Sequence, residues 1–311
     1  MRDIFVSSLT EIAINDSNIY LVTGDLGFGI FDNFREKCPQ QFINAGISEQ
    51  NMTGVAVGLA LSGKKVFTYS IGNFSTLRCL EQIRNDAAYH NANITVVSSG
   101  GGYSYGALGM SHHATEDIAI MRALPNVKCF VPSTNKEVEY LMQLTTNIKG
   151  TKYLRLEKLG CKLSKNIQES ESLKIGEPNI LKDGSDICLI GSGGILQEAI
   201  DASEILEERG LSTKIISLHT IKPIEPEALN KVLSGVKVLL VIEEHNQHGG
   251  IYSALAELLL QSDLKIIVGN ISIPDCYLSI VGDQNYLRSQ IGLSKEYIVS
   301  MAQNLFSKTM S

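Results

Sequence analysis

Short, continuous apolar segments alternate with helix-like segments along the whole chain, and this alternation limits the fold more than any other feature. The strand-like segments of the first half are rich in β-branched residues and lie at 19–24, 65–70, 94–99 and 127–132. A strand that is apolar on both faces needs helices on both sides of its sheet. The pattern therefore predicts an α/β fold of open, mostly parallel sheets sandwiched between helices.

The alternation breaks once and then restarts, which predicts two domains. Residues 161–180 are mostly polar and predict a linker, and strand-like segments return at 186–191, 213–220, 237–245 and 265–271. A chain of 311 residues is long enough for two cores. We expect a first domain at 1–160, a linker at 161–180 and a second, smaller domain at 181–311.

Composition excludes several classes of protein. The net charge of -6 without basic runs argues against a nucleic-acid or anionic-membrane partner. No apolar stretch approaches the roughly 20 residues of a membrane span, and the first residues do not resemble a signal peptide. The six cysteines are scattered and predict reduced thiols without a metal site: Cys38, Cys79, Cys129, Cys161, Cys188 and Cys276. We expect a soluble cytoplasmic protein.

The segment 44–54 combines a helix start with a carboxylate. Ser48 is a plausible N-cap and Glu49 opens the helix, and the residues after it are almost all apolar. Glu49 could simply complement the helix dipole. A carboxyl group at the start of a buried helix is also suited to sharing a proton with a ligand nitrogen.

Two later loops carry further candidates. Tyr69 and Phe74 flank a strand end, where an aromatic ring can either stack on a flat heterocycle or pack in the core. The segment 98–113 is rich in glycine and hydroxyl groups and ends in His112 and His113. Glycines allow the backbone to approach a ligand, and a histidine transfers protons near neutral pH. For His113 a structural role is the better prediction.

Several separated blocks together resemble one family. They are GDLGFG, NAGISEQNMTGVAVGLALSG, FSTLRCLEQIRNDAAY, GMSHHATEDIAIMRALPNVKCFVPS, HTIKPI and EEHNQHGG, which begin at residues 24, 44, 74, 109, 219 and 243. In this order they resemble the C-terminal half of transketolase, and above all the split transketolases in which this half is a separate chain. The resemblance implies a pyrimidine-binding domain followed by a transketolase C-terminal domain. It also implies transfer of a two-carbon ketol unit from a ketose to an aldehyde.

The resemblance assigns cofactor-binding roles to five residues. Glu49 matches the glutamate that hydrogen-bonds the aminopyrimidine ring of thiamine diphosphate and helps to activate the cofactor. Phe74 matches the aromatic residue that stacks on this ring, and Tyr69 is a weaker candidate for the same role. Asp25 and Leu26 match the loop that contacts the cofactor near the subunit interface.

It assigns substrate-binding roles to three more. His112 resembles the active-site histidine that hydrogen-bonds the donor carbonyl, which makes it the second catalytic candidate beside Glu49. Arg2 and Arg155 resemble two arginines that clamp a substrate phosphate, a task that suits the bidentate guanidinium.

The motif that holds Mg2+ and diphosphate in thiamine diphosphate enzymes is not found in this sequence. GDLG, KDGS and VGDQN, which begin at residues 24, 182 and 281, do not match it. By resemblance the motif belongs to the other half of transketolase. We therefore expect a partner subunit that carries the diphosphate and Mg2+ site, no metal ligands on this chain, and a heterotetramer of two copies of each subunit.

Three positions depart from the family in ways that concern the substrate. A sugar-recognising aspartate falls on Leu108, a phosphate-contacting histidine falls on Gly100, and a phosphate-contacting serine falls on or near Gly29. Sites built to hydrogen-bond hydroxyl groups discriminate strongly by them. We therefore predict a modified or non-standard sugar substrate. Two alternatives stay open: a relative that uses a 2-oxo acid donor, of the deoxyxylulose-phosphate synthase or oxo-acid dehydrogenase beta type, and a non-catalytic binding subunit.

Overall fold

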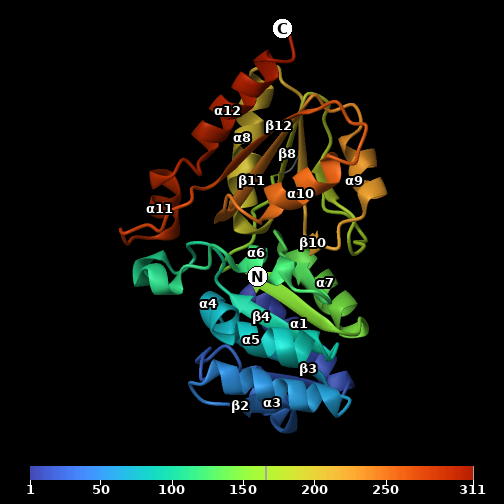
Figure 1. Cartoon of the computed structure of the whole chain (residues 1–311), viewed down its shortest axis with the longest axis vertical. Helices are drawn as coiled ribbons and strands as arrows, with labels where there is room; N and C mark the ends of the chain where they lie inside the picture. Colours follow the sequence, from blue (N-terminus) through green and yellow to red (C-terminus); the bar gives the residue numbers. More distant parts are fainter. Residues whose placement is uncertain (165–166, 311) are drawn as a thin grey trace.

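A computed structural model describes residues 1–164 and 167–310. It shows two stacked α/β domains, each built on one open sheet, with the N-terminus near the level where the domains meet and the C-terminus at the far end (Figure 1). The predicted fold class is confirmed. Residues 165–166 of the predicted linker and residue 311 of the second domain lie outside the described residues.

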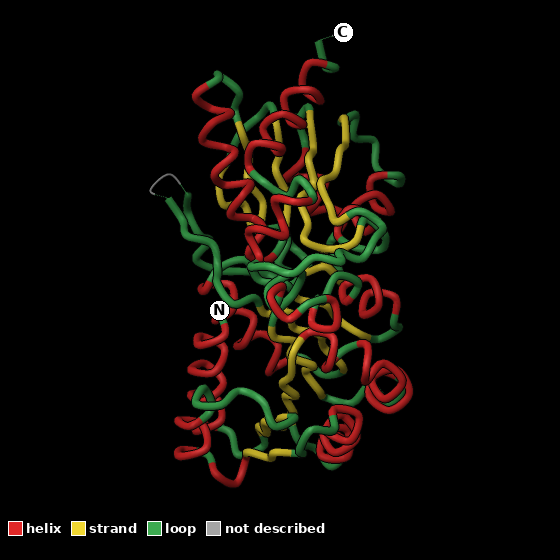
Figure 2. Tube along the Cα trace, turned by 90° about the vertical axis from the view of Figure 1, so that its left-hand side faces the viewer, coloured by secondary structure: helices red, strands yellow, loops and turns green. Residues whose placement is uncertain are grey.

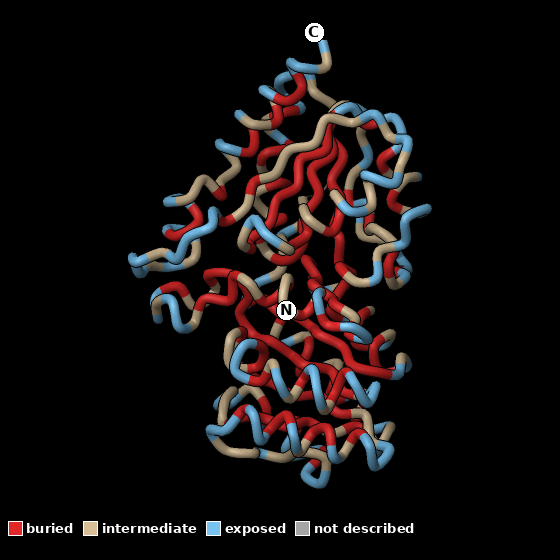
Figure 3. Tube along the Cα trace, in the orientation of Figure 1, coloured by how far each residue is buried: buried red, intermediate tan, exposed pale blue. Residues whose placement is uncertain are grey.

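The first sheet has seven strands, and all but one of its pairings are parallel. In spatial order they are β10 (Thr220–Lys222), β5 (Val127–Phe130), β6 (Thr151–Leu156), β4 (Ile94–Ser99), β3 (Lys65–Ile71), β1 (Ile19–Thr23) and β2 (Phe42–Asn44). The four predicted strand segments of the first half correspond to β1, β3, β4 and β5. Figure 3 shows why the segments are apolar throughout, since the central strands are buried along their length.

Helices cover both faces of this sheet. On one face α1 (Arg2–Asn15), α2 (Asp32–Lys37) and α7 (Asn135–Asn147) enclose an apolar core, and on the other α3 (Glu49–Leu61) encloses a second. The segment after β3 forms a series of short helical pieces: α4 (Gly72–Ser75), a 3-10 turn (Leu77–Cys79), α5 (Leu80–Gln82) and a π-helical turn (Ile83–Ala88). A further helix, α6 (Asp117–Ala123), precedes β5.

The second sheet has five strands and lies above the first in Figure 1. Its order is β12 (Ile267–Ile273), β11 (Val238–Asn246), β8 (Ile187–Gly191), β9 (Thr213–Ser217) and β7 (Asn179–Lys182), where β7 is antiparallel and starts within the segment predicted as a linker. Its helices are α8 (Leu196–Glu208), α9 (Pro226–Leu233), α10 (Ile251–Leu259), α11 (Gln284–Gln290) and α12 (Lys295–Ser307). None of the described helices is long and apolar enough to cross a membrane.

The two domains share both a strand and a core. β10 belongs in sequence to the second half but pairs antiparallel with β5 of the first sheet. One apolar cluster joins Val96 and Tyr153 of the first domain to Ile216 and Leu255 of the second. Figure 2 shows the two sheets from the side with loops gathered between them. The loops at this junction are therefore held from both domains.

A buried lysine lies at the start of β6. Lys152 is 1% exposed, and its ammonium group donates to Asn93 Oδ1 (2.6 Å) and to the Ile148 carbonyl (2.7 Å). Burial lowers the pKa of Lys152 to about 7, far below the ordinary 10.5. Between these values the folded chain keeps the amine neutral while the unfolded chain protonates it.

We expect Lys152→Met to flatten the dependence of stability on pH. In the wild type the unfolded chain binds the extra proton between about pH 7 and 10.5, so the free energy of unfolding rises with pH there, by up to ~1.4 kcal/mol per pH unit. Urea unfolding at pH 7, 8 and 9 measures this slope. Lys149→Met at an exposed position is the control, and equal slopes in wild type and Lys152→Met would contradict the prediction.

Candidate active site

Glu49 occupies the first position of α3 and is almost completely buried. Its side chain is 4% exposed and packs beside Gly24, where an added Cβ would lie 3.3 Å from Glu49 Cγ. Ser48 takes the predicted N-cap position, but its hydroxyl donates to the Ala45 carbonyl (3.3 Å) and makes no capping bond. The carboxylate is therefore directed by its packing and its ion pair.

The partner of Glu49 is Arg78, which sequence reasoning did not single out. Arg78 Nη1 donates to Glu49 Oε2 (2.8 Å), and its guanidinium carbon lies 4.0 Å from the centre of the Phe74 ring. The signal that could have found it is the four-residue spacing of Phe74 and Arg78, which places two side chains on one face of a helical turn.

Phe74 connects this pair to the histidine. The ring centres of Phe74 and His112 lie 5.1 Å apart at 63°. The Asn73 amide holds the histidine loop by donating to the backbone carbonyls of Ser111 (3.4 Å) and His113. Glu49, Arg78, Phe74 and His112 thus form one continuous group of side chains, which we call the active-site cluster.

The two adjacent histidines have different surroundings. His112 is half-buried, and its Nδ1 lies 3.0 Å from the Ser111 hydroxyl. His113 is 4% exposed and packs edge-on against Tyr103, with 4.9 Å between the ring centres. Burial lowers the pKa of His113, so this ring stays neutral near pH 7. The predicted structural role of His113 agrees with this environment.

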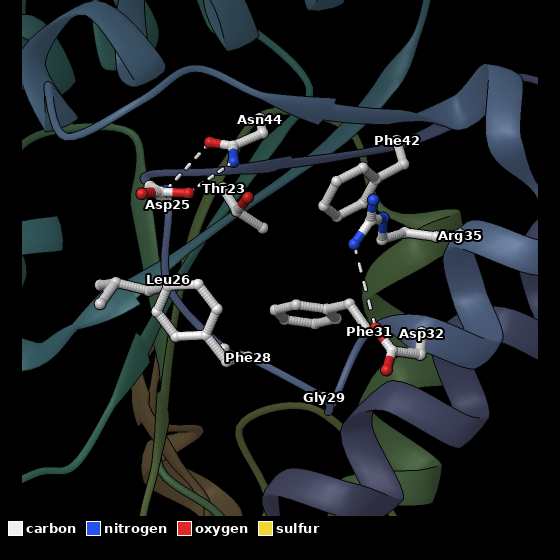
Figure 4. Close-up of a pocket in the computed structure, with 11 residues that line it drawn as sticks. Thr23, Asp25, Leu26, Phe28, Gly29, Phe31, Asp32, Arg35, Phe42 and Asn44 are labelled. Carbon is white, nitrogen blue, oxygen red and sulfur yellow. Dashed lines mark hydrogen bonds and ion pairs between the residues drawn. The ribbon is translucent and has the colours of Figure 1, made fainter.

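Asp25 and Leu26 line a separate cavity of about 200 Å³ beside the cluster. Figure 4 shows Asp25 paired with Asn44 at one end of this cavity, with Leu26 and Phe28 along one side. Asn44 Nδ2 donates to Asp25 Oδ1 (2.8 Å), which helps to hold Asp25 at a positive φ of 57°. Gly24 separates this loop from Glu49, so the cavity and the cluster are neighbours.

The other two N-terminal candidates lie elsewhere. Tyr69 is 3% exposed, and its ring packs against Phe5 (6.0 Å) and edge-on against Phe31 (4.9 Å). Burial raises the pKa of Tyr69 to about 12. Its position fits the core-packing alternative rather than a stacking role. Arg2, at the start of α1, pairs with its exposed neighbour Asp3 (3.1 Å).

Arg155 is not available as a cation for the active-site cluster, because acceptor groups of the protein already engage its guanidinium. It is 2% exposed, and it donates to Asp117 Oδ1 (3.2 Å) and to the Glu244 carbonyl (2.9 Å). Arg288 Nη2 pairs in turn with Glu244 (2.5 Å) and Glu157 (3.7 Å). We call Arg155, Asp117, Glu157, Glu244 and Arg288 the interdomain charge network, because it joins β6 and α6 of the first domain to β11 and α11 of the second.

The interdomain charge network and Tyr105 explain three glycines of the segment 98–113, where glycine was expected to allow the approach of a ligand. A Cβ at Gly101 would lie 1.7 Å from Arg155 Nε, and one at Gly102 would lie 2.5 Å from Glu244 Cδ. At Gly100, which has φ of 86°, a Cβ would lie 2.2 Å from the Tyr105 ring. These three glycines therefore make room for the protein's own side chains.

Two family models match the chain. The transketolase pyrimidine-binding domain matches residues 1–161, and the transketolase C-terminal domain matches residues 176–298. The chain belongs to the transketolase family. Over nearly its whole length it corresponds to the subunit of split transketolases that carries these two domains.

The relatives include proteins named as transketolase subunits. The chain is 31% identical over 310 residues to an apulose-4-phosphate transketolase subunit of Phocaeicola vulgatus, covering 99% of this chain and 97% of that protein. It is 29% identical over 306 residues to the 6-deoxy-6-sulfo-D-fructose transketolase subunit SqwH of a Clostridium species, covering 98% and 94%. Among solved structures, a split-gene transketolase described as an inactive beta4 tetramer matches with a TM-score of 0.87, 28% identity, and coverage of 98% and 97%.

Proposed function

We propose that this chain is the C-terminal subunit of a two-component transketolase that depends on thiamine diphosphate and moves a two-carbon ketol unit from a ketose to an aldehyde. The observation that carries the proposal is the buried Glu49 carboxylate at the start of α3, which Arg78 links to the face of Phe74. Desolvation of a buried carboxylate is costly, and the cation that offsets it here, Arg78, is itself 45% exposed, unlike the buried cations of the interdomain charge network. The proposal therefore assigns the carboxylate to the cofactor.

The residues present suit the aminopyrimidine ring of the cofactor. We call the space beside Glu49 Oε2 and the face of Phe74 the aminopyrimidine seat. It already holds a flat group with N–H donors, the guanidinium of Arg78. When bound, thiamine diphosphate supplies the carbon nucleophile that the two-carbon transfer requires. Glu49 would share a proton with a ring nitrogen and Phe74 would stack on the ring. Asp25 and Leu26 would border the cofactor from the neighbouring cavity.

His112 is proposed to hydrogen-bond the substrate carbonyl. The Ser111 hydroxyl lies at hydrogen-bond distance from Nδ1, which leaves Nε2 for a substrate oxygen. Asn73 holds the loop, so the ring is oriented before substrate arrives. Arg2, with its side chain 38% exposed, remains the candidate for an anionic tail of the substrate.

The diphosphate and Mg2+ are assigned to a partner subunit. In the described part of the chain, no three His, Cys, Asp or Glu side chains lie close enough together to hold a metal ion. The two relatives described above are named as subunits, and the split-gene relative forms a tetramer of one chain type that is described as inactive. The names of these relatives and the inactive tetramer support activity that requires a partner chain, and we propose an assembly of two copies of each.

Glu49 and Phe74 are proposed to serve the cofactor and His112 the substrate carbonyl, whereas the loop that precedes His112 exposes apolar side chains where the sugar would bind. Leu108 and Met110, which precede His112, are 57% and 53% exposed. The two relatives are named for apulose 4-phosphate and 6-deoxy-6-sulfo-D-fructose. We propose a modified sugar as a substrate of this chain's complex too, and ordinary rates with xylulose 5-phosphate and ribose 5-phosphate would disprove it.

We expect Leu108→Asp to raise kcat/KM for xylulose 5-phosphate about tenfold relative to hydroxypyruvate, because a restored carboxylate can accept a sugar hydroxyl bond. Met110→Asp is the matched control, since it adds the same charge at a similarly exposed position in the same loop. Steady-state assays of the two-chain complex give both ratios. An equal rise in both variants would show a general effect of charge.

The first experiment is a two-carbon transfer assay with thiamine diphosphate and Mg2+, run with and without a partner chain that carries the diphosphate-binding domain. The donors are xylulose 5-phosphate, hydroxypyruvate and pyruvate. Transfer from a ketol donor only when both chains are present would support the proposal. Activity with pyruvate alone would favour a 2-oxo acid enzyme, and no activity with any donor would favour a non-catalytic subunit.

A further inference from the structure

Arg78 makes the two contacts that the proposed function gives to the cofactor ring. Its guanidinium donates to Glu49 Oε2 at 2.8 Å, and its central carbon lies 4.0 Å above the Phe74 ring. A guanidinium is flat and carries several N–H donors, and an aminopyrimidine is also flat and bears an amino group. The protein's own side chain therefore imitates the part of the cofactor that this seat would bind.

The guanidinium and the cofactor ring cannot use the same seat together. One face of a phenyl ring holds one flat group at van der Waals distance, and Glu49 Oε2 is already engaged. Arg78 must therefore move before a ring can stack at this face of Phe74. This step rests on the proposed function, because it takes thiamine diphosphate as the ligand.

The Arg78 side chain can move out of the seat into solvent. Its side chain is 45% exposed, in contrast to the fully buried Arg155, so solvent lies beside it. It follows α4 in a 3-10 turn (Leu77–Cys79). Exposed side chains change rotamer within nanoseconds. When the cofactor ring binds, its N–H groups would replace the guanidinium at Glu49, so the buried carboxylate would not be left unpaired. The seat can thus open without disturbing the packed core.

We propose that Arg78 is a gate that closes the aminopyrimidine seat of the cofactor-free chain and swings outward when thiamine diphosphate binds. A ligand that needs a partly populated open state binds with an apparent affinity reduced by the open fraction. While closed, the guanidinium keeps the buried Glu49 carboxylate paired. Arg78 therefore stabilises the buried carboxylate of the cofactor-free chain, and it lowers the apparent affinity for the cofactor.

The test is the Kd of the two-chain complex for thiamine diphosphate, measured by isothermal titration calorimetry with Mg2+ present and no substrate. Arg78→Ala is expected to lower Kd about tenfold, as for a seat that is open about a tenth of the time. Arg78→Lys keeps the charge but cannot stack a flat group, so we expect it to lower Kd about threefold. Arg84→Ala, which removes a cation in the following π-helical turn, is expected to leave Kd unchanged.

Three results would overturn the gate. A weaker Kd in Arg78→Ala would make Arg78 part of the bound cofactor's site. An unchanged Kd would show that Arg78 does not block the seat. A lower Kd in Arg78→Ala but not in Arg78→Lys would show that the positive charge, and not the flat guanidinium, weakens cofactor binding. If the wild-type complex binds no thiamine diphosphate, the proposed function itself fails, which is a separate outcome. Thermal unfolding of each variant checks that it is folded.

Discussion

Replacing Glu49 with glutamine is expected to lower two-carbon transfer by the reconstituted complex by about 10²–10⁴-fold, the usual contribution of a positioned proton donor or acceptor. The amide has nearly the same shape as the carboxyl group and can still accept a bond from Arg78, so the fold of α3 should be kept. It cannot take up and return a proton at the cofactor ring. The rate of transfer from a ketol donor, measured at saturating thiamine diphosphate, reports the effect.

The matched control for this variant is Glu81→Gln. Glu81 lies in the neighbouring short helix α5 and is exposed, so its substitution removes the same charge outside the active-site cluster. We expect this control to retain at least half of the wild-type rate. If Glu49→Gln is equally active, the assignment of Glu49 as the proton-handling residue falls, and the non-catalytic alternative regains weight.

The sequence was sufficient for β1, β3, β4 and β5 of the first sheet, but not for its strands β2 and β6. Continuous β-branched runs mark β1, β3, β4 and β5 because a strand buried on both faces has no polar face to alternate with. β10 was not anticipated as part of the first sheet. It has three residues and pairs with a strand about 90 positions earlier, and no local pattern encodes such a pairing.

The site shows the same division between local and non-local information. Glu49, Phe74 and His112 were assigned from motifs that resemble transketolase, and they lie together around Arg78. Tyr69 and Arg155 were assigned in the same way, yet both are buried and already engaged. Which face of a strand meets a core, and which cation meets acids from another domain, depends on contacts between distant segments.

Loss of Arg155 is expected to have the largest effect on stability. Arg155→Met would leave Asp117 and Glu157 without this cation in a junction where both are at most 3% exposed. Removing one member of a buried ion pair typically costs about 3–5 kcal/mol, because the remaining charge is neither solvated nor paired. Urea unfolding of wild type and variant at pH 8 measures this loss.

The pH dependence of that loss identifies its cause. Burial and the neighbouring Glu244 already raise the pKa of Glu157 to about 7 in the wild type. A carboxyl group with a raised folded pKa binds more protons in the folded chain than in the unfolded chain, so its contribution to stability falls as the pH rises from about 4.5 to 7. Without the Arg155 cation this pKa rises further. The destabilisation by Arg155→Met should therefore be smaller at pH 5.5 than at pH 8.

A charge-balanced variant separates electrostatics from packing. In the double variant Asp117→Asn with Arg155→Met, the closest unpaired carboxylate is gone and the apolar volume is the same as in the single variant. We expect it to recover at least ~1 kcal/mol of the loss, the scale of coupling between residues that contact each other. If the double variant is no more stable than Arg155→Met, or if the loss is equal at both pH values, the cost arises from packing against Gly101. The charge network would then not be what fixes the two domains against each other.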